Sequence, residues 1–299
     1  MSDSLSRREL LRSAAAVAAS LVIPRTAVVD PDLARLTAWT SALRTEGLSR
    51  QEAPFPRSVI RVGELAAGTP YTAGTLEAYI RAGGRPTRTE PLTLSLTHFD
   101  CVTLVESCLA VARASDRDGA ATWRRFGREI ERMRYRGGKR RAYASRLHYF
   151  SEWISDGEER GLVRGLGAEL GAVDDVRPLR FMTEHRGSYP ALVSDEVFRE
   201  IGTMEHQLDG RPRRVIPTEK IAGVVHKIAS GDVLAFATSI PGLDVTHSAF
   251  AYRGRDGILR VLHAPLSGGV VAVTKTTLPE YVAAIRHSTG ILVARPLRT

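Results

Sequence analysis

The sequence has 299 residues and a formal net charge of +9 at neutral pH, and 43% of its residues are hydrophobic. This length and composition allow one large globular domain or two small ones, and they exclude an intrinsically disordered chain. The positive charge favours an anionic partner such as nucleic acid, a membrane surface or the bacterial wall. Aromatic residues make up only 6% of the chain, and no compact basic run is interleaved with them, so we expect no nucleic-acid partner.

The first thirty residues carry the features of an exported protein. The paired Arg7 and Arg8 are followed by an apolar stretch over residues 13–23 that is rich in Ala and Val. This arrangement resembles a twin-arginine export signal, and the stretch is shorter than a bilayer span, which needs about 20 residues. An amphipathic first helix and a retained membrane tether are the alternatives.

We therefore expect residues 1–28 to be an export signal that the twin-arginine export machinery recognises, and residues 29–299 to be a single domain. This domain should act after export, in the periplasm or elsewhere in the cell envelope. No other segment is long and apolar enough to suggest a stable membrane span.

The first half of the domain has helical periodicity. Apolar residues recur every three or four positions over residues 30–46, which predicts an amphipathic helix. Proline and glycine are frequent over residues 54–70, which favours loops and short strands there. Further helices are predicted at 101–112, where the helix is apolar on most faces, at 123–133, where it is charged, and at 152–161.

The final third of the chain has a period of two instead. Short apolar or alternating runs, separated by Gly and Pro, are typical of antiparallel strands. Such strands are predicted at residues 232–237, 246–252, 259–264 and 291–294. A helix is predicted to begin at Thr277, which is a suitable N-cap with Pro279 in the first turn. Helices followed by a strand meander predict an α+β domain, with inserted segments between about residues 115 and 225.

The chain has only two cysteines, Cys101 and Cys108, which fall in one predicted helix. Two helical turns separate their Cα atoms by about 10 Å, which exceeds the limit of about 7 Å for a disulfide. Cys101 lies at the helix start, where free backbone N–H groups and the helix dipole stabilise a thiolate and a developing oxyanion. Cys101 is therefore predicted to be a nucleophile, with a small core residue as the alternative, and Cys108 is predicted to be a core residue.

A thiol nucleophile needs an imidazole to accept its proton and a third group to orient that imidazole. His247 and His263 lie in two predicted strands, on either side of residues 253–257, whose composition suggests a hairpin loop. If the hairpin is centred on Arg255, the two imidazoles face each other with Cβ atoms about 5 Å apart. A bulge or a different loop length would change this register. Either histidine alone is more typical of a half-buried strand residue.

These residues together resemble a known family. The order in which they occur is that of the NlpC-type papain-like cell-wall cysteine peptidases: Tyr71, Asp100, Cys101, the strand at 231–236, His247 and His263. The resemblance is closer to a bacterial N-acetylmuramoyl-L-alanine amidase-like family. It is carried by the segments 70–77, 98–106, 145–149 and 243–247.

The resemblance implies a papain-like, NlpC-type α+β fold. In this fold an antiparallel sheet packs on the helix that carries the nucleophilic cysteine, and helical segments are inserted. It implies Cys101 as the nucleophile, His247 as general base and then acid, and His263 as the group that orients His247. Tyr71 and Asp100, beside the nucleophile, would contact the substrate or the oxyanion.

The segment 143–153 is the predicted substrate-binding site. Arg146 offers a cation for a stem-peptide carboxylate, and His148 and Tyr149 offer flat rings for packing against sugar or peptide. Alternatively, Tyr149 and Trp153, which are four residues apart on one helix, pack on the core.

The function that the resemblance implies is hydrolysis of the amide bond between N-acetylmuramic acid and L-alanine in peptidoglycan or muropeptides. No metal and no organic cofactor are expected. A stem-peptide endopeptidase or an acyl transferase with the same Cys-His-His site is an alternative, although residues 102–104 (Val-Thr-Leu) favour the amidase-like branch.

Two further alternatives differ in kind. One is a non-catalytic wall-binding protein that keeps the fold without turnover. The other is a zinc hydrolase that uses His247, His263 and Asp244. Against the zinc hydrolase, the sequence contains no HExxH motif or similarly spaced ligand set.

Overall fold

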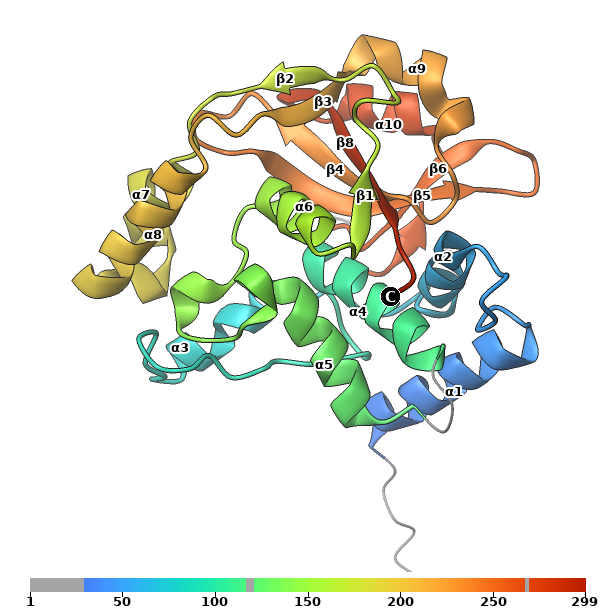
Figure 1. The fold of residues 1–299 in the computed structure, drawn as a ribbon, viewed down its shortest axis with the longest axis horizontal. Helices are drawn as coiled ribbons and strands as arrows, with labels where there is room; N and C mark the ends of the chain where they lie inside the picture. The colour runs from blue at the N-terminus through green and yellow to red at the C-terminus, as the bar shows by residue number, and fades with distance from the viewer. Residues whose placement is uncertain (1–29, 117–120, 267–268) are drawn as a thin grey trace, which may run out of the picture. The chain divides into compact units, whose positions relative to one another are not determined.

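Alternating apolar residues in the second half of the chain build an antiparallel sheet (Figure 1). The computed structural model describes residues 30–116, 121–266 and 269–299, so the predicted export signal at 1–28 lies outside the described residues. Within them, the strand order is β2-β3-β8-β4-β5-β6-β7, and β1 pairs with β8 in addition. The strands are β1 (Val163–Gly165), β2 (Val173–Asp175), β3 (Arg213–Pro217), β4 (Val233–Thr238), β5 (Val245–Arg253), β6 (Leu259–His263), β7 (Ala272–Val273) and β8 (Ser288–Pro296).

Helices dominate the first half of the chain. Together with helices from the second half, they cover both faces of the sheet (Figure 1). The predicted α+β class with an antiparallel sheet is therefore confirmed. In the described part of the chain, no helix combines the length and the apolar character that crossing a membrane requires. The helices are α1 (Pro31–Thr45), α2 (Phe55–Leu65), α3 (Ala78–Arg81), α4 (Cys101–Ser115), α5 (Trp123–Arg134), α6 (Phe150–Glu159), α7 (Phe181–Glu184), α8 (Asp195–Gln207), α9 (Ile221–Val224) and α10 (Leu278–Ala284).

The two faces of the sheet contribute to two separate cores. In β5, Phe250 belongs to the core formed with α1, α2, α4 and α5, whereas Ala249 and Ala251 belong to the core that α10 covers. This split follows from the strand geometry, because successive side chains point to opposite faces. Helices α9 and α10 lie on one side of the sheet in Figure 1, and α2, α4 and α6 lie on the other. The two faces of the sheet are therefore covered by different helices and belong to different apolar cores.

Helix α4 begins at the predicted cysteine because Asp100 caps it. The Asp100 carboxylate accepts a hydrogen bond from the Thr103 amide (2.7 Å), and the Thr103 hydroxyl accepts one from the Asp100 amide (2.9 Å). This reciprocal capping box satisfies backbone donors that a helix start leaves free. Every residue from Thr103 to Ser115 is buried, so α4 is a central element of the core and its first residue is firmly positioned.

Inside this core, α4 makes a buried ion pair with the next helix. The Glu106 carboxylate lies 2.7 Å from the Arg134 guanidinium, and the two side chains are 1% and 3% exposed. Arg134 also donates to the Thr93 carbonyl (2.6 Å). The pair joins α4 to α5 and to the segment that precedes α4.

Helix α2 (Phe55–Leu65) replaces the loops and short strands predicted for most of residues 54–70, so that prediction is wrong there, whereas the turn at 66–68 and the bridge at Pro70 agree with it. Pro54 is the N-cap and Pro56 lies in the first turn, where proline removes no helical hydrogen bond. Gly63 lies inside the helix at a place where a Cβ atom would come within 3.1 Å of the Leu262 side chain on the sheet. Glycine therefore permits the close approach of the helix to the sheet. The residues that suggested a break in structure thus permit the helix and its close packing.

The predicted insertion between about 115 and 225 contains helices α5 to α9 and strands β1 to β3. Part of it forms a third apolar cluster, in which Tyr149 packs with Leu192 and Ile201. Helix α6 begins directly after Tyr149 and runs toward β1. The insertion is thus connected both to this cluster and to the sheet.

Candidate active site

Cys101 is the first residue of α4 and is partly exposed, whereas Cys108 is fully buried. Both thiols are free, which confirms the prediction that the pair forms no disulfide. The Asp100 side chain was predicted to contact substrate, but the structure uses it as the helix cap. The exposure difference separates a candidate nucleophile from a core residue on the same helix.

The two predicted histidines meet across β5 and β6. The Nε2 atom of His247 lies 3.0 Å from the Nδ1 atom of His263, and the rings are close to perpendicular (73°). His263 is only 6% exposed. The two imidazoles thus form a hydrogen-bonded pair on one face of the sheet.

The register that produces this pair differs from the predicted one. Phe250 faces Leu262 and Ala251 faces Val261, so the hairpin is centred on Asp256 and not on Arg255. The Asp256 carboxylate accepts a hydrogen bond from the Ile258 amide (3.1 Å), which stabilises this loop. Pairing is displaced by two residues, and since the side-chain period is also two, both histidines stay on the same face as diagonal neighbours.

A bulge at Thr246 precedes His247. Phe236 pairs with His247, but Ala237 pairs with Val245, so Thr246 is the extra residue in β5. Bulges of this kind re-aim neighbouring side chains and are frequent near active sites. The His247 ring stacks on Phe236, with centroids 5.7 Å apart and planes 13° apart, which fixes its orientation on the α10 face.

The thiol of Cys101 lies against the open edge of β5. The Ala251 amide donates to Asp232 at the β4 side (2.8 Å), so the Ser248 amide, three residues away, points to the opposite edge because strand amides alternate. Strand β6 ends at His263, and within the described ranges no strand pairs with this part of the edge. Here the amide and hydroxyl of Ser248 are close enough to the Cys101 thiol to lower its pKa.

The surroundings of Cys101 have opposing effects on its charge. Burial raises the pKa of the Cys101 thiol, and the nearby Asp100 carboxylate raises it further. The donor groups of Ser248, its amide and its hydroxyl, and the Val102 amide lower the pKa, but they do not fully offset these effects. Cys101 therefore rests as a neutral thiol beside donors that favour its thiolate.

Two tyrosines complete the site. Tyr71 is held by a bridge to Phe99, and burial together with the charge of a Cys101 thiolate raises the pKa of Tyr71, so the predicted neighbour is close to the sulfur. Tyr281 of α10 was not predicted. Its hydroxyl lies 3.2 Å from the Nδ1 atom of His263, and burial, with the Cys101 charge, raises the pKa of Tyr281 to about 12.

Both histidines are neutral in this environment. Burial lowers the pKa of His247 to about 3, and the neighbouring His263 contributes to this shift. Burial also lowers the pKa of His263 to about 4. Neutral imidazoles can accept a proton, so at neutral pH the pair is in the state that a general base requires.

These pKa shifts predict a loss of stability in mild acid. The unfolded histidines bind protons below about pH 6.5, whereas the folded ones do so only near pH 3 to 4. The unfolded state therefore holds more protons in this window, and the free energy of unfolding falls as the pH falls, by up to about 1.4 kcal/mol per pH unit for each histidine. Denaturant unfolding from pH 7 to pH 4 measures this slope.

The double variant His247→Gln/His263→Asn isolates the contribution of the two imidazoles from that of the carboxylates. Its unfolding free energy should depend less steeply on pH than that of the wild type over the same range. Equal slopes for the two proteins would contradict buried, neutral histidines.

The predicted substrate-binding residues in segment 143–153 have internal partners instead. The Arg146 guanidinium is 5% exposed and pairs with Glu77 (2.5 Å) and, at 3.6 Å, with Glu90. Tyr149 is 2% exposed and donates to Glu205 (2.6 Å), while the His148 ring contacts the Tyr143 carbonyl (3.0 Å).

This arrangement corrects the expected role of Arg146, His148 and Tyr149. Burial and the adjacent Arg146 charge lower the pKa of His148. Arg146 and Tyr149 are therefore buried in internal contacts, and the Nε2 atom of His148 is engaged by the Tyr143 carbonyl. The alternative of Tyr149 packing in the interior describes the structure better.

The zinc alternative needs Asp244 as a third ligand near the histidines. Asp244 is 3% exposed, and its carboxylate accepts hydrogen bonds from the amides of Ser151 and Val245 (both 2.7 Å). Across the ranges that the structure describes, no three His, Cys, Asp or Glu side chains gather as a metal-binding group. Asp244 instead ties the start of β5 to the first turn of α6.

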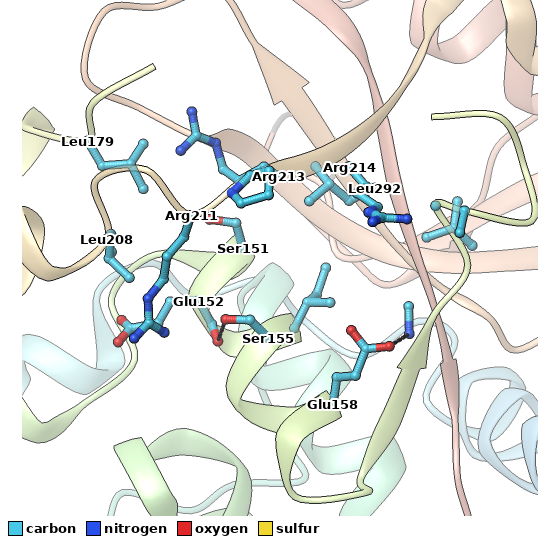
Figure 2. Close-up of a pocket in the computed structure, with 16 residues that line it drawn as sticks. Ser151, Glu152, Ser155, Glu158, Leu179, Leu208, Arg211, Arg213, Arg214 and Leu292 are labelled. Atoms are coloured by element: carbon cyan, nitrogen blue, oxygen red, sulfur yellow. Dashed lines mark hydrogen bonds between the residues drawn. The ribbon is translucent and has the colours of Figure 1, made fainter. Parts of the chain in front are cut away.

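Figure 2 shows a pocket of about 400 Å³ between α6, β3 and β8. None of the predicted site residues lines it. Arg213 directs its guanidinium to Asp175 (3.0 Å) and to the Arg177 carbonyl (2.7 Å), and Glu152 is paired with Arg136 (3.0 Å). Because these charged groups already have partners, the reactive side chains at Cys101 are the better candidate for the active site.

Comparisons with known proteins find similarity over most of the chain. A family model described as AmiA-like, N-acetylmuramoyl-L-alanine amidase-like, matches residues 61–291. A crystal structure of an N-acetylmuramoyl-L-alanine amidase from Bacteroides uniformis has 29% sequence identity and a TM-score of 0.74. The match covers 82% of this chain and 99% of that one. The curated protein sequences contain no significant match.

Two other solved structures are similar. A Bacteroides fragilis protein, described as a candidate xylanase, has 34% identity and a TM-score of 0.71, over 78% of this chain and 98% of that one. A Legionella pneumophila protein has 18% identity and a TM-score of 0.64, over 88% and 94% of the two chains, and at this identity it shows the fold alone. Since the family model spans most of the chain, the protein belongs to the N-acetylmuramoyl-L-alanine amidase-like (AmiA-like) family.

Proposed function

We propose that the protein is a peptidoglycan amidase that hydrolyses the bond between N-acetylmuramic acid and L-alanine with Cys101 as its nucleophile. Membership of the amidase-like family supports the substrate class. The observation that carries the chemistry is the meeting of three elements. Cys101 at the start of α4 faces β5 at Ser248, the charge of Cys101 acts on Tyr281, and Tyr281 contacts the hydrogen-bonded pair of neutral histidines.

The first chemical step is attack of the Cys101 sulfur on the lactyl carbonyl of N-acetylmuramic acid. His247 uses Nε2 to contact His263, so its Nδ1 atom is the one that accepts the thiol proton. For this the Nε2 atom of His247 carries hydrogen and donates to the Nδ1 atom of His263. Free backbone N–H groups at the start of α4 stabilise the oxyanion of the tetrahedral intermediate.

Collapse of the intermediate breaks the C–N bond, and His247 gives its proton to the leaving amine of L-alanine. The sugar acid remains as a thioester on Cys101. Water then attacks the thioester, His247 accepts a proton from this water, and the proton returns to the sulfur as the carboxylate product leaves. The chain needs no external electron donor or acceptor for this hydrolysis.

The resemblance to papain-like enzymes completes this proposal. Tyr71 lies close to Cys101 and is proposed to hold the substrate carbonyl region. We also propose a papain-like, NlpC-type arrangement for the sheet and α4, and export by the twin-arginine machinery to the periplasm or cell envelope. The net charge of +9 suits association with an anionic wall.

The xylanase description of the Bacteroides fragilis protein suggests a different chemistry. Hydrolysis of a glycosidic bond typically uses two carboxylates that flank the bond. Here the carboxylate beside Cys101 belongs to Asp100, which caps α4 through Thr103. The thiol and imidazoles suit acyl transfer from an amide better than glycoside hydrolysis.

Product analysis by mass spectrometry tests the proposal. The exported form is incubated with a defined disaccharide-tetrapeptide muropeptide. Release of the free tetrapeptide and the intact disaccharide is the expected result. Cleavage inside the tetrapeptide would assign the same site to an endopeptidase, and an intact muropeptide would contradict the proposed substrate.

A further inference from the structure

Ser248 has an unusual environment for a serine. It is 1% exposed, and its hydroxyl oxygen has no hydrogen-bond partner among the residues that the structure describes. A buried hydroxyl normally has such a partner because it has lost its hydrogen bonds to water. The exception therefore requires an explanation from its surroundings.

The position of Ser248 in β5 explains where this hydroxyl points. His247 and Ser248 are adjacent, so their side chains leave opposite faces of the sheet. His247 lies on the α10 face with Phe236, and Ser248 lies on the face that packs against α4. The Ser248 hydroxyl and amide are thus both directed toward the first residue of α4.

The site also needs hydrogen-bond donors near the sulfur. Burial disfavours charge on Cys101, and the nearest carboxylate, that of Asp100, repels a thiolate. From the other elements, Tyr71 and Tyr281 lie within range of the Cys101 charge, and the His247–His263 pair contacts Tyr281. None of these is a cation in the resting protein, so apart from the imidazolium that forms when His247 takes the thiol proton, negative charge on the sulfur depends on neutral donors.

We propose that Ser248 is a further catalytic residue that donates hydrogen bonds from its amide and its hydroxyl to the Cys101 sulfur whenever the sulfur carries negative charge. This inference deepens the proposed function, on which it rests for the role of Cys101. Ser248 acts when the thiol loses its proton to His247, and again when the sulfur leaves the thioester. Its hydroxyl keeps no other partner, so it can turn toward the charge without breaking an existing bond.

Alkylation of Cys101 by iodoacetamide tests this role without any wall substrate. The measurement uses a Cys108→Ala background, so that only one thiol is present, and follows the reaction rate from pH 6 to pH 10. Because hydrogen bonds to charged groups are stronger than those to neutral ones, Ser248→Ala should slow alkylation about tenfold at neutral pH and move the midpoint of its pH profile upward.

Two variants control the experiment. Ser248→Thr keeps a hydroxyl and should react close to the parental rate. Ser107→Ala removes a buried hydroxyl from α4 itself, one that donates to the Ser95 carbonyl, and should not change the rate. Equal rates for Ser248→Ala and Ser107→Ala, or an equally slow Ser248→Thr, would overturn the inference.

The alkylation experiment can succeed or fail independently of the muropeptide cleavage assay that tests the proposed function. If no protein cleaves the muropeptide but Ser248→Ala still slows alkylation, the substrate assignment fails and the role of Ser248 at the thiol stands. If cleavage occurs and Ser248→Ala alkylates like the control, the amidase assignment stands and Ser248 has no such role.

Discussion

Cys101→Ala should abolish amide hydrolysis, with a loss of at least about 10⁴-fold in kcat/KM, because no other group can form the acyl intermediate. The helix cap made by Asp100 and Thr103 does not involve the thiol, so the variant should fold normally. Steady-state release of tetrapeptide from the muropeptide, followed by mass spectrometry, measures the loss.

Cys108→Ala is the matched control for this variant. Cys108 lies on the same helix but is fully buried, and burial raises the pKa of its thiol well above the usual range. Its replacement should leave the rate within about twofold of the wild type, since an inert core thiol takes no part in the reaction. A Cys101→Ala enzyme that keeps more than about one hundredth of the activity would contradict nucleophilic catalysis by this residue.

Arg134→Met should cause the largest loss of stability, about 3 to 5 kcal/mol in the free energy of unfolding. The substitution leaves the Glu106 carboxylate in the core of α4 without its counter-charge, at a place where both side chains are almost fully buried. Burial already raises the pKa of Glu106, and Arg134 opposes this shift. Urea unfolding at pH 7 measures the effect.

A surface pair supplies the comparison. Arg61 and Glu46 are joined at 2.8 Å, but their side chains are 32% and 38% exposed, so Glu46→Gln should cost less than about 1 kcal/mol. The double variant Arg134→Met/Glu106→Leu should recover part of the loss, because it removes the uncompensated charge. If Arg134→Met were as stable as Glu46→Gln, the buried pair would have no special importance.

The sequence predicted the elements with strong local signals. Helix α4 begins at Cys101 as expected, because Asp100 and Thr103 occupy the positions of a capping box, and α10 follows the predicted cap at Thr277. Helix α2 was missed because proline and glycine were taken as breaks in structure. Only the contact of Gly63 with Leu262, about 200 residues away, explains that glycine.

The histidine pair shows what the alternation of side chains along a strand can and cannot predict. The face of each strand was predicted correctly from the alternation of apolar residues. The register was wrong by two residues, because loop geometry depends on local hydrogen bonds such as that of the Asp256 carboxylate with the Ile258 amide. The shared face survived this error because it depends only on whether the shift is even.

The remaining site residues have no local signal. Tyr281 reaches His263 only because α10 packs on the sheet, and Ser248 follows His247 in a strand whose edge partner is absent at that point. Conversely, Arg146 appeared free in the sequence, yet Glu77 and Glu90 neutralise it from distant segments. Long-range ion pairs of this kind cannot be deduced from residue spacing.

The separation of the two thiols along α4 has a consequence for oxidative damage. If peroxide converts Cys101 to a sulfenic acid, a nearby thiol would normally condense with it and protect it from further oxidation. Cys108 is the only other cysteine of the chain, and it is sealed in the core two turns further along the helix. Recovery therefore depends on a small thiol or a reductase supplied by the surroundings, and without one the oxidised sulfur proceeds to irreversible sulfinic acid.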